Sequence, residues 1–291
     1  MRCACIDIGS NTTRVLVADV AGGELREVVC EKAFTRLGSA LRRTGCLPSE
    51  ALAALAEVVA AQRAVATSLS ALRVRVVATA AIRAAADPEA LVAAIAERTG
   101  LFVDVLGTQE EARLAFAGAT HARRAPVEGP VAVVDVGGGS TEIAVGPVGG
   151  GVQWSASLAL GSSTLADDHL HSDPPSRSEL DCVAREVAAA FSALDPPAVD
   201  VALAVGGSAT STARLVGPRI DAQTLGRALA ILAATPSDAV VSTYGLDLER
   251  VRLLPAGLHL LGAAAARLGR PLEVGDGGVR EGVCLELAAS Q

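Results

Sequence analysis

Two acidic residues flank a run of three glycines near the middle of the chain. Residues 134–142 read VDVGGGSTE, so Asp135 precedes the glycines and Glu142 follows them. Successive glycines allow a sharp backbone turn, and the N–H groups exposed in such a turn can bind an anion. The two carboxylates suit a metal ion or a proton-transfer step. A hairpin whose glycines serve only the turn would show the same pattern.

A second copy of this pattern lies at the start of the chain. Residues 6–13 read IDIGSNTT, and one constant shift along the chain places Asp7 on Asp135 and Thr13 on Thr141. One such hairpin in each half predicts two related domains that face each other across a cleft. A polyanion in that cleft would meet backbone N–H groups from both sides.

Three further segments carry residues suited to phosphate chemistry, each with an ordinary structural explanation. Glu111 stands three residues after Thr108, which is also the spacing of a helix capping box. Arg83 could hold phosphates or be an exposed helix arginine. Residues 206–210 read GGSAT after a predicted strand, so their N–H groups could bind an anion or simply allow close helix–strand packing.

Strands that alternate with helices are expected to position these residues. In the first half, strands are predicted at 3–8, 14–20, 26–34, 74–78 and 101–106, a polar loop at 35–39, and helices at 49–68, 88–100 and 108–120. In the second half, strands are predicted at 131–136, 141–146, 152–160 and 200–205, and helices at 162–170, 177–194, 222–234 and 255–268. A helix should also begin at the 206–210 segment, and a glycine-rich turn at 274–282 precedes a terminal helix. This order predicts an α/β fold. Charge and proline density near 118–129 predict domains 1–120 and 121–291.

The composition argues against several functional classes. The chain has 291 residues, of which 51% are hydrophobic and 20% charged, enough to build two globular domains. Aromatic residues make up only 2% and the net charge is −7, so neither a nucleic-acid nor a membrane partner is expected. Lys32 is the only lysine, which excludes a Walker A phosphate-binding loop.

The remaining composition predicts a cytoplasmic protein. No signal peptide is recognised, and no uncharged apolar run reaches the ~18 residues of a membrane span. The six cysteines contain no Cys-x-x-Cys pair and are expected to be reduced.

Taken together, these segments resemble the exopolyphosphatase/guanosine pentaphosphate phosphohydrolase (Ppx/GppA) family of the actin-like ATPase superfamily. The resemblance rests on IDIGSNTT at 6–13, ATAAIR at 78–83, EEARL at 110–114, VDVGGGSTE at 134–142, GGSAT at 206–210 and DGGVREG at 276–282. The segments span nearly the whole chain in the family order. The resemblance implies two actin-like (ribonuclease H-like) domains, with mixed sheets flanked by helices and a cleft between them.

The resemblance also implies hydrolysis of a terminal phosphoanhydride with Mg²⁺ or Mn²⁺. Glu111 matches the glutamate proposed to activate water, while Asp135 and Glu142 match carboxylates that place metal and water. Asp7 joins Asp135 and Glu142 as a candidate metal ligand. The implied phosphate-binding residues are Gly9, Ser10, Asn11, Thr12, Thr13, Arg83, Gly137, Gly138, Gly139, Ser140, Thr141, Gly207 and Ser208. The role of Arg280 stays open.

The leading expectation is an exopolyphosphatase acting on inorganic polyphosphate. A preference for short chains is expected because longer family members carry an extra helical region after the REG segment. Guanosine pentaphosphate is the alternative substrate, since both molecules end in a phosphoanhydride. A non-catalytic sensor and a sugar or acetate kinase are the further options. The resemblance also makes a homodimer one expectation.

Overall fold

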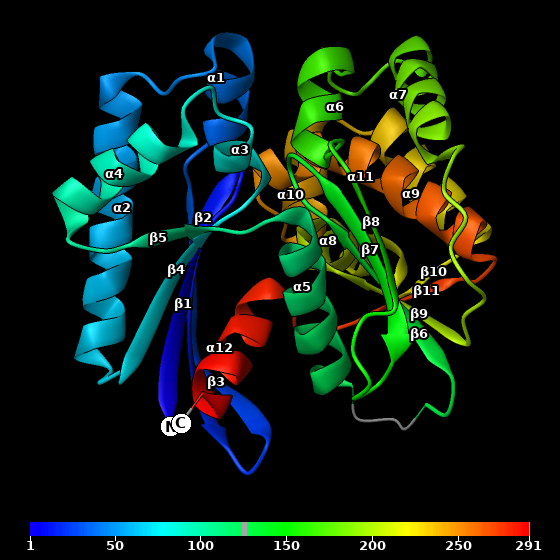
Figure 1. The fold of residues 1–291 in the computed structure, drawn as a ribbon. Helices are drawn as coiled ribbons and strands as arrows, with labels where there is room; N and C mark the ends of the chain where they lie inside the picture. The colour runs from blue at the N-terminus through cyan, green and yellow to red at the C-terminus, as the bar shows by residue number, and fades with distance from the viewer. Residues whose placement is uncertain (124–126, 291) are drawn as a thin grey trace. The chain divides into compact units, whose positions relative to one another are not determined.

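The protein has the α/β architecture expected from its sequence. A computed structural model describes residues 1–123 and 127–290. The chain forms two compact units, one comprising Met1–Ala122 with Gly277–Gln291 and the other Arg123–Asp276. Each unit contains one sheet flanked by helices, as Figure 1 shows.

The sheet of the first unit has five strands in the order β3-β2-β1-β4-β5. The strands are β1 (Arg2–Ile8), β2 (Thr12–Ala21), β3 (Glu24–Phe34), β4 (Arg73–Ala78) and β5 (Val103–Val105). The first three form an antiparallel meander, whereas β4 and β5 run parallel to β1. The turn after β1 therefore lies at the same edge of the sheet as the segments that follow β4 and β5.

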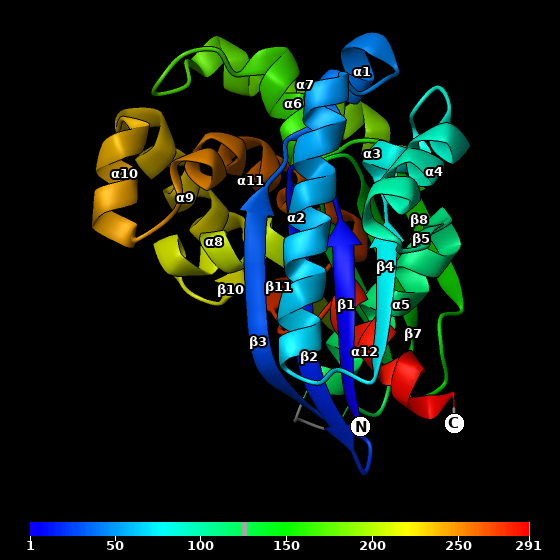
Figure 2. The same cartoon turned by 90° about the vertical axis from the view of Figure 1, so that its left-hand side faces the viewer.

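Helices cover both faces of this sheet. They are α1 (Leu37–Thr44), α2 (Ser49–Ser68), α3 (Ala80–Arg83), α4 (Pro88–Thr99), α5 (Thr108–Ala122) and α12 (Val279–Ala289). Alternation along β1 sends Ala4 and Ile6 into one apolar core with α2, and Cys3 and Cys5 into another with α5 and α12. Figure 2 shows α2 lying over the sheet.

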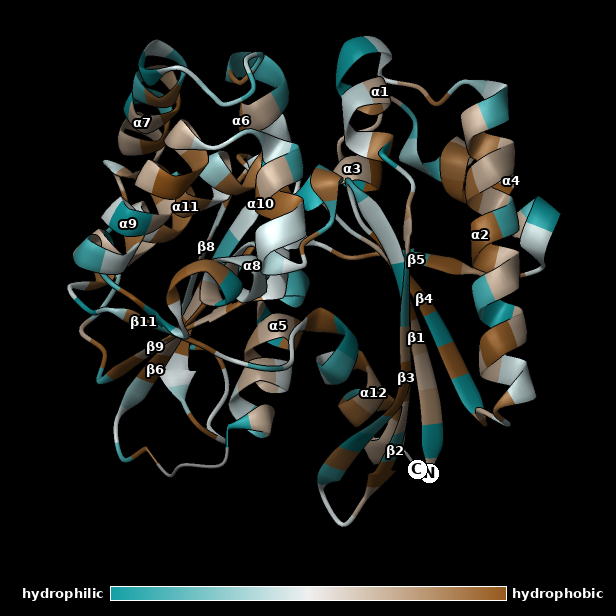
Figure 3. Cartoon of the chain, turned by 180° about the vertical axis from the view of Figure 1, so that it is seen from behind, coloured by the Kyte–Doolittle hydropathy of each residue, from teal (hydrophilic) through white to brown (hydrophobic). Residues whose placement is uncertain are grey.

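Helix α2 is long and apolar enough to cross a membrane by length and composition. Its Leu55 and Val59 side chains are buried in the core of the first unit, while Glu57 is exposed. Figure 3 shows both hydrophobic and hydrophilic stretches along it. Its buried Gln62 donates a hydrogen bond to the carbonyl of Thr13 at 3.0 Å, so α2 also supports the first glycine hairpin. It is thus a core helix of this unit.

The second unit has a six-stranded sheet in the order β10-β11-β9-β6-β7-β8. The strands are β6 (Pro130–Val136), β7 (Thr141–Pro147), β8 (Trp154–Leu158), β9 (Val201–Val205), β10 (Arg219–Ile220) and β11 (Leu272–Val274). The meander β6-β7-β8 is antiparallel, and β9 runs parallel to β6. The five strands β8-β7-β6-β9-β11 therefore repeat the order of the first sheet, which supports the predicted internal repeat.

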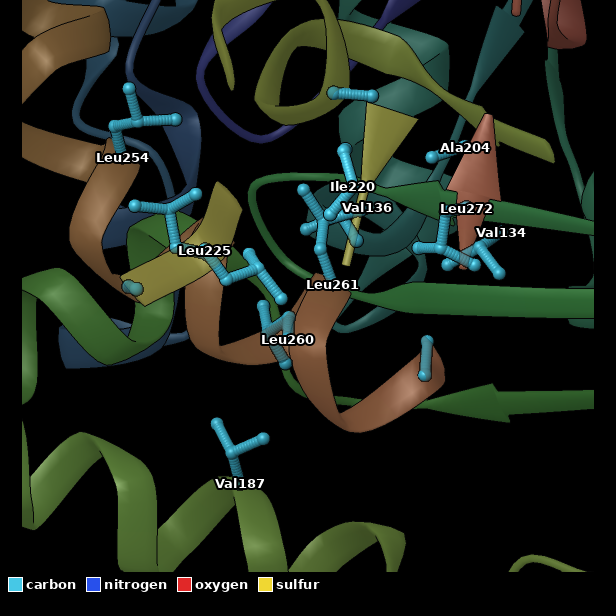
Figure 4. Packing of buried hydrophobic residues seen from close by; sticks show 14 of the residues in the cluster. Val134, Val136, Val187, Ala204, Ile220, Leu225, Leu254, Leu260, Leu261 and Leu272 are labelled. Carbon is cyan, nitrogen blue, oxygen red and sulfur yellow. The ribbon is translucent and has the colours of Figure 1, made fainter. Parts of the chain in front are cut away.

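The helices of the second unit pack around a core rich in aliphatic residues. They are α6 (Ser162–His169), α7 (Arg177–Phe191), α8 (Gly206–Val216), α9 (Ala222–Ala234), α10 (Ser237–Tyr244) and α11 (Leu248–Leu268). In Figure 4, Leu260 and Leu261 of α11 lie among buried side chains of the sheet and of α9. With few aromatics available, aliphatic side chains of α11 fill the centre of this unit.

Most predicted elements are confirmed, and several differ. Residues 37–39 of the predicted polar loop 35–39 already belong to α1, and α3, α10 and β10 were not predicted. Helix α12 begins at Val279, inside the predicted turn 274–282. Helix α11 begins at Leu248 and contains Pro255 in its interior, whereas the sequence predicted a start at that proline. The boundary region predicted near 118–129 begins inside α5 and contains residues 124–126, which lie outside the described residues.

The predicted second domain, 121–291, needs a correction at its C-terminal end. The last helix, α12, belongs to the first unit. Its Val279, Val283 and Cys284 side chains are buried with Cys3 and Cys5 of β1. Burial of this apolar face outweighs the chain order, so the segment from residue 277 onward returns to the N-terminal sheet.

Candidate active site

Both glycine hairpins form tight turns with the same internal hydrogen bond. In the first unit the N–H of Gly9 donates to the carbonyl of Thr12 at 3.1 Å, and in the second that of Gly137 donates to the carbonyl of Ser140 at 3.0 Å. A Cβ built on either glycine would lie 3.1 Å from that carbonyl oxygen. A side chain there would crowd the turn, so glycine suits both positions.

Chain segments after the third strand of the first sheet hold the carbonyl groups of the first turn. The N–H groups of Thr35 and Arg36 both donate to the carbonyl of Asn11 at 3.0 Å, and that of Gly38 donates to Ser10 at 2.8 Å. Arg36 adopts a left-handed backbone conformation (φ 51°), which is uncommon for a residue other than glycine. The segment predicted as a loop is therefore a rigid support for the turn.

The second turn is supported in the same way by the start of α6. The N–H of Ser162 donates to the carbonyl of Gly137 at 2.9 Å, and those of Ser163 and Thr164 donate to the carbonyl of Gly138. A Cβ at Gly161 would lie only 2.3 Å from the Gly138 carbonyl, so this close approach requires glycine. Because the carbonyl groups are engaged in both turns, the peptide planes that carry the N–H groups are held in place.

The two carboxylates of the second unit lie on neighbouring strands. Asp135 of β6 is the direct cross-strand partner of Glu142 of β7, so both side chains emerge on the same face of the sheet. Glu142 is buried and accepts a hydrogen bond from the Ser157 hydroxyl at 2.8 Å. Like charges directly opposite each other are destabilising, and a bound cation would remove that cost.

The first unit has a carboxylate and an arginine at the equivalent positions. Asp7 of β1 is the cross-strand partner of Arg14 of β2. The Oδ1 atom of Asp7 is buried and has no hydrogen-bond partner among the described residues. Burial raises the pKa of Asp7, and the charges of Arg280 and Arg14 oppose this rise. A buried carboxylate oxygen without a partner fits a cation ligand.

The predicted base, Glu111, lies in the first turn of α5 and is 7% exposed. Its Oε2 accepts a hydrogen bond from Arg83 Nη1 at 2.8 Å, and the same nitrogen donates to the carbonyl of Leu106 at 2.6 Å. The structure thus joins Arg83 to Glu111, a contact that the sequence analysis did not foresee. A charge-assisted bond of this kind fixes the orientation of the Glu111 carboxylate.

At the third predicted phosphate site, Gly207 and Ser208 begin α8 at the end of β9. Ser208 is 1% exposed, and its hydroxyl oxygen would be 2.7 Å from a Cβ on Gly257 of α11, so the hydroxyl faces that helix. A Cβ on Gly207 would lie 2.5 Å from the guanidinium of Arg250. Sequence reasoning missed Arg250 because the first two turns of α11 were not predicted. The sequence did show Arg250 five residues before Pro255, and that arginine could have been considered as a site residue.

The predicted residues therefore gather at one edge of each sheet. In the first unit, Asp7, residues 9–13, Arg83 and Glu111 follow the carboxyl ends of β1, β4 and β5. In the second unit, Asp135, residues 137–142 and Gly207 follow the carboxyl ends of β6 and β9. Each half of the chain thus presents a glycine turn together with at least one acidic side chain.

The sequence model of the Ppx/GppA phosphatase family matches residues 15–291. The chain belongs to this family. Exopolyphosphatase 2 of Mycobacterium tuberculosis is 37% identical over 195 residues, which cover 64% of this chain and 60% of that protein. Less than two thirds of that relative is therefore matched. Exopolyphosphatase 1 of Mycobacterium bovis is 27% identical over 309 residues, covering 100% of this chain and 89% of the relative.

Solved structures agree with the assignment to the Ppx/GppA family. The Aquifex aeolicus family member superposes with a TM-score of 0.83 at 26% identity, covering 100% of this chain and 99% of the other. An exopolyphosphatase from Cytophaga hutchinsonii superposes with a TM-score of 0.87 at 20% identity, a likeness that concerns the fold alone. The actin-like fold implied by the family resemblance is thereby confirmed.

The acidic residues of this Ppx/GppA chain fit a hard divalent cation. Mg²⁺ binds oxygen ligands and is usually held by one or two carboxylates together with substrate phosphates. In the second unit, the opposed pair Asp135 and Glu142 supplies two such ligands. Among the described residues there is no group of three or more metal-binding side chains. Two carboxylates with phosphate oxygens are therefore the arrangement that suits these residues.

Proposed function

We propose that this protein is a metal-dependent exopolyphosphatase that releases orthophosphate from the end of inorganic polyphosphate. The observation that carries the proposal is the pair of matching glycine turns, each held through its carbonyl groups and each beside an acidic residue. Each turn presents backbone N–H groups suited to phosphate oxygens. Membership of the Ppx/GppA phosphatase family supports the same reaction class.

In the proposed reaction, backbone N–H groups of residues 9–13 and 137–141 hold phosphate oxygens. Glu111 accepts a proton from water, whose oxygen attacks the terminal phosphorus while the bond to the bridging oxygen breaks. The products are orthophosphate and a polyphosphate shortened by one unit. Arg83 keeps the Glu111 carboxylate in place through their 2.8 Å hydrogen bond. Mg²⁺ or Mn²⁺, held by Asp135 and Glu142 of the second unit or by Asp7 of the first, would offset charge on the phosphates.

The decisive experiment measures orthophosphate release from polyphosphates of defined length with Mg²⁺ or Mn²⁺. Glu111→Gln should lower kcat by about 10²–10⁴, because the amide cannot take the proton from water. Glu110→Gln is the matched control, because Glu110 is bonded to Arg113 on the same helix at 2.6 Å and is not assigned to the reaction. Equal activity of the Glu111 variant and the wild type would remove Glu111 from its proposed role.

The same assay separates polyphosphate from guanosine pentaphosphate. Both substrates carry a terminal phosphoanhydride, so competition for a single site would assign them to the same residues. Release from guanosine pentaphosphate alone would overturn the polyphosphate proposal and favour that nucleotide. Tight phosphate binding without any turnover would instead indicate a sensor.

A further inference from the structure

The DGGVREG segment contains an arginine and a glutamate that the proposed reaction does not use. Arg280 and Glu281 lie in the first turn of α12, and their side chains are only 16% and 15% exposed. The Arg280 guanidinium is 3.5 Å from the sulfur of Cys30 on β3 and 3.9 Å from a carboxylate oxygen of Glu281. A charged side chain buried this deeply needs compensation by its neighbours.

The register of β1 shows which neighbour matters. Cys3, Cys5 and Asp7 alternate along the strand, so all three side chains emerge on the face covered by α12. Cys284 of α12 packs with Cys3 and Cys5, and Arg280 stands one helical turn closer to the N-terminus of α12. That turn lies toward the end of β1 where Asp7 precedes the glycine hairpin. No ion pair within 4.0 Å joins Arg280 to Asp7, but the positive charge of Arg280 lowers the pKa of Asp7 against the rise caused by burial.

The first turn of α12 packs closely against α5, the helix that carries Glu111. A Cβ on Gly118 of α5 would lie 2.1 Å from the carbonyl oxygen of Gly278, and one on Gly282 would lie 2.1 Å from that of Leu114. The two backbones therefore touch. This contact prevents Arg280 from moving independently of the Glu111 helix.

We propose that Arg280 is a positioning residue whose buried guanidinium holds the Asp7 carboxylate beside the first glycine hairpin. The proposal rests on the function proposed above, in which Asp7 is a candidate cation ligand beside the first glycine turn. The arginine touches neither the reacting phosphorus nor the attacking water. It acts through Asp7 by charge and not by a hydrogen bond, since Asp7 Oδ1 has no hydrogen-bond partner among the described residues.

A kinetic comparison tests the role in turnover. Arg280→Gln should lower kcat for polyphosphate by about tenfold or more, with KM changed less than kcat, as for residues that orient a metal ligand. Arg280→Lys keeps the charge and should recover part of the loss. The matched control is Arg113→Gln, because Arg113 joins α5 to Glu286 of α12 at 2.7 Å through an exposed ion pair. Wild-type kcat in Arg280→Gln, or an equal loss in Arg113→Gln, would overturn the proposal.

A double-mutant cycle tests whether the effect passes through Asp7. Arg280→Gln should lower the urea midpoint of unfolding strongly in the wild-type background and much less in Asp7→Asn, because the second background has no charge to compensate. Glu281 also faces Arg280, so the cycle is repeated with Glu281→Gln, where coupling to Asp7 should persist. If Arg280→Gln lowered the urea midpoint equally in the wild-type and Asp7→Asn backgrounds, Arg280 would contribute only to packing.

The double-mutant cycle needs no substrate, so the role of Arg280 can be tested separately from the proposed exopolyphosphatase activity. If the wild type releases no phosphate from any polyphosphate, the proposed function fails, while the cycle still decides whether Arg280 acts on Asp7. If Arg280→Gln does not fold, the double variant with Asp7→Asn should recover folding because both charges are gone. Failure of that recovery would contradict the proposal.

Discussion

At the scale of single residues, a neighbouring side chain orients a carboxylate in the second unit. Glu142 is 2% exposed, and the Ser157 hydroxyl donates to its Oε1 at 2.8 Å. The next strand thus fixes one oxygen of the Glu142 carboxylate. Arg83 has the same relation to Glu111 in the first unit.

Ser157→Ala should therefore lower phosphate release by about tenfold, within the range known for residues that orient metal ligands. Glu142 would keep its charge but lose the bond that orients it, so the metal concentration for half-maximal activity should rise. Steady-state rates over a Mg²⁺ titration measure both effects. Ser155→Ala on the same strand is the control, because Ser155 is exposed. Identical Mg²⁺ titrations for the two variants would refute the role of Ser157.

At the scale of elements, the start of α7 shows how local hydrogen bonds define a helix. Ser176 caps the helix and forms a capping box with Glu179. The Glu179 carboxylate also accepts bonds from the N–H groups of His171 and Ser172, at 2.8 and 2.9 Å. Burial opposes the charge on Glu179, but these donors outweigh it and lower the pKa of Glu179 to about 2.

Glu179→Gln should lower the free energy of unfolding by about 1 kcal/mol near neutral pH, as for other helix caps. The folded pKa lies below the unfolded value of 4.5, so this contribution is present above that pH and is lost as pH falls towards about 2. Urea unfolding should therefore show a gap between variant and wild type at about pH 7 that narrows at about pH 3. Asp195→Asn, at an exposed site beyond the end of α7, is the control. A gap independent of pH would contradict the assignment.

At the scale of the whole molecule, the chain ends in the unit where it began. The contact that makes this possible is the approach of the α5 and α12 backbones at Gly118, Gly278 and Gly282. No other residue type allows helices to touch in this way. The last helix therefore completes the core beneath Asp7 and Glu111 and does not extend the second unit.

Gly118→Ala should destabilise the protein by about 1–3 kcal/mol or more, because its Cβ would lie 2.1 Å from the Gly278 carbonyl oxygen. Gly226→Ala is the matched control, since its Cβ would meet no atom within 4 Å and alanine favours the helix. Hydrogen exchange should report the loss in β1, β2 and α12, with β6 and β7 unaffected. An unchanged exchange pattern would show that α5 and α12 can separate without cost.

The sequence alone determined the strand–turn–strand units around Asp7 and Asp135, because a buried apolar run, a glycine turn and a second alternating run are local signals. It also determined the internal repeat and the family resemblance, since both depend on motifs readable in order. Tertiary structure alone decided the placement of α12, the Arg83–Glu111 bond and the position of Arg250 against Gly207. These contacts join segments far apart in the chain. They form because apolar surfaces are buried together and opposite charges pair in the folded protein, and neither can be read from neighbouring residues in the sequence. Tertiary structure also decided the short helices α1 and α10, because packing against the rest of the protein stabilises them more than their own helix propensity does.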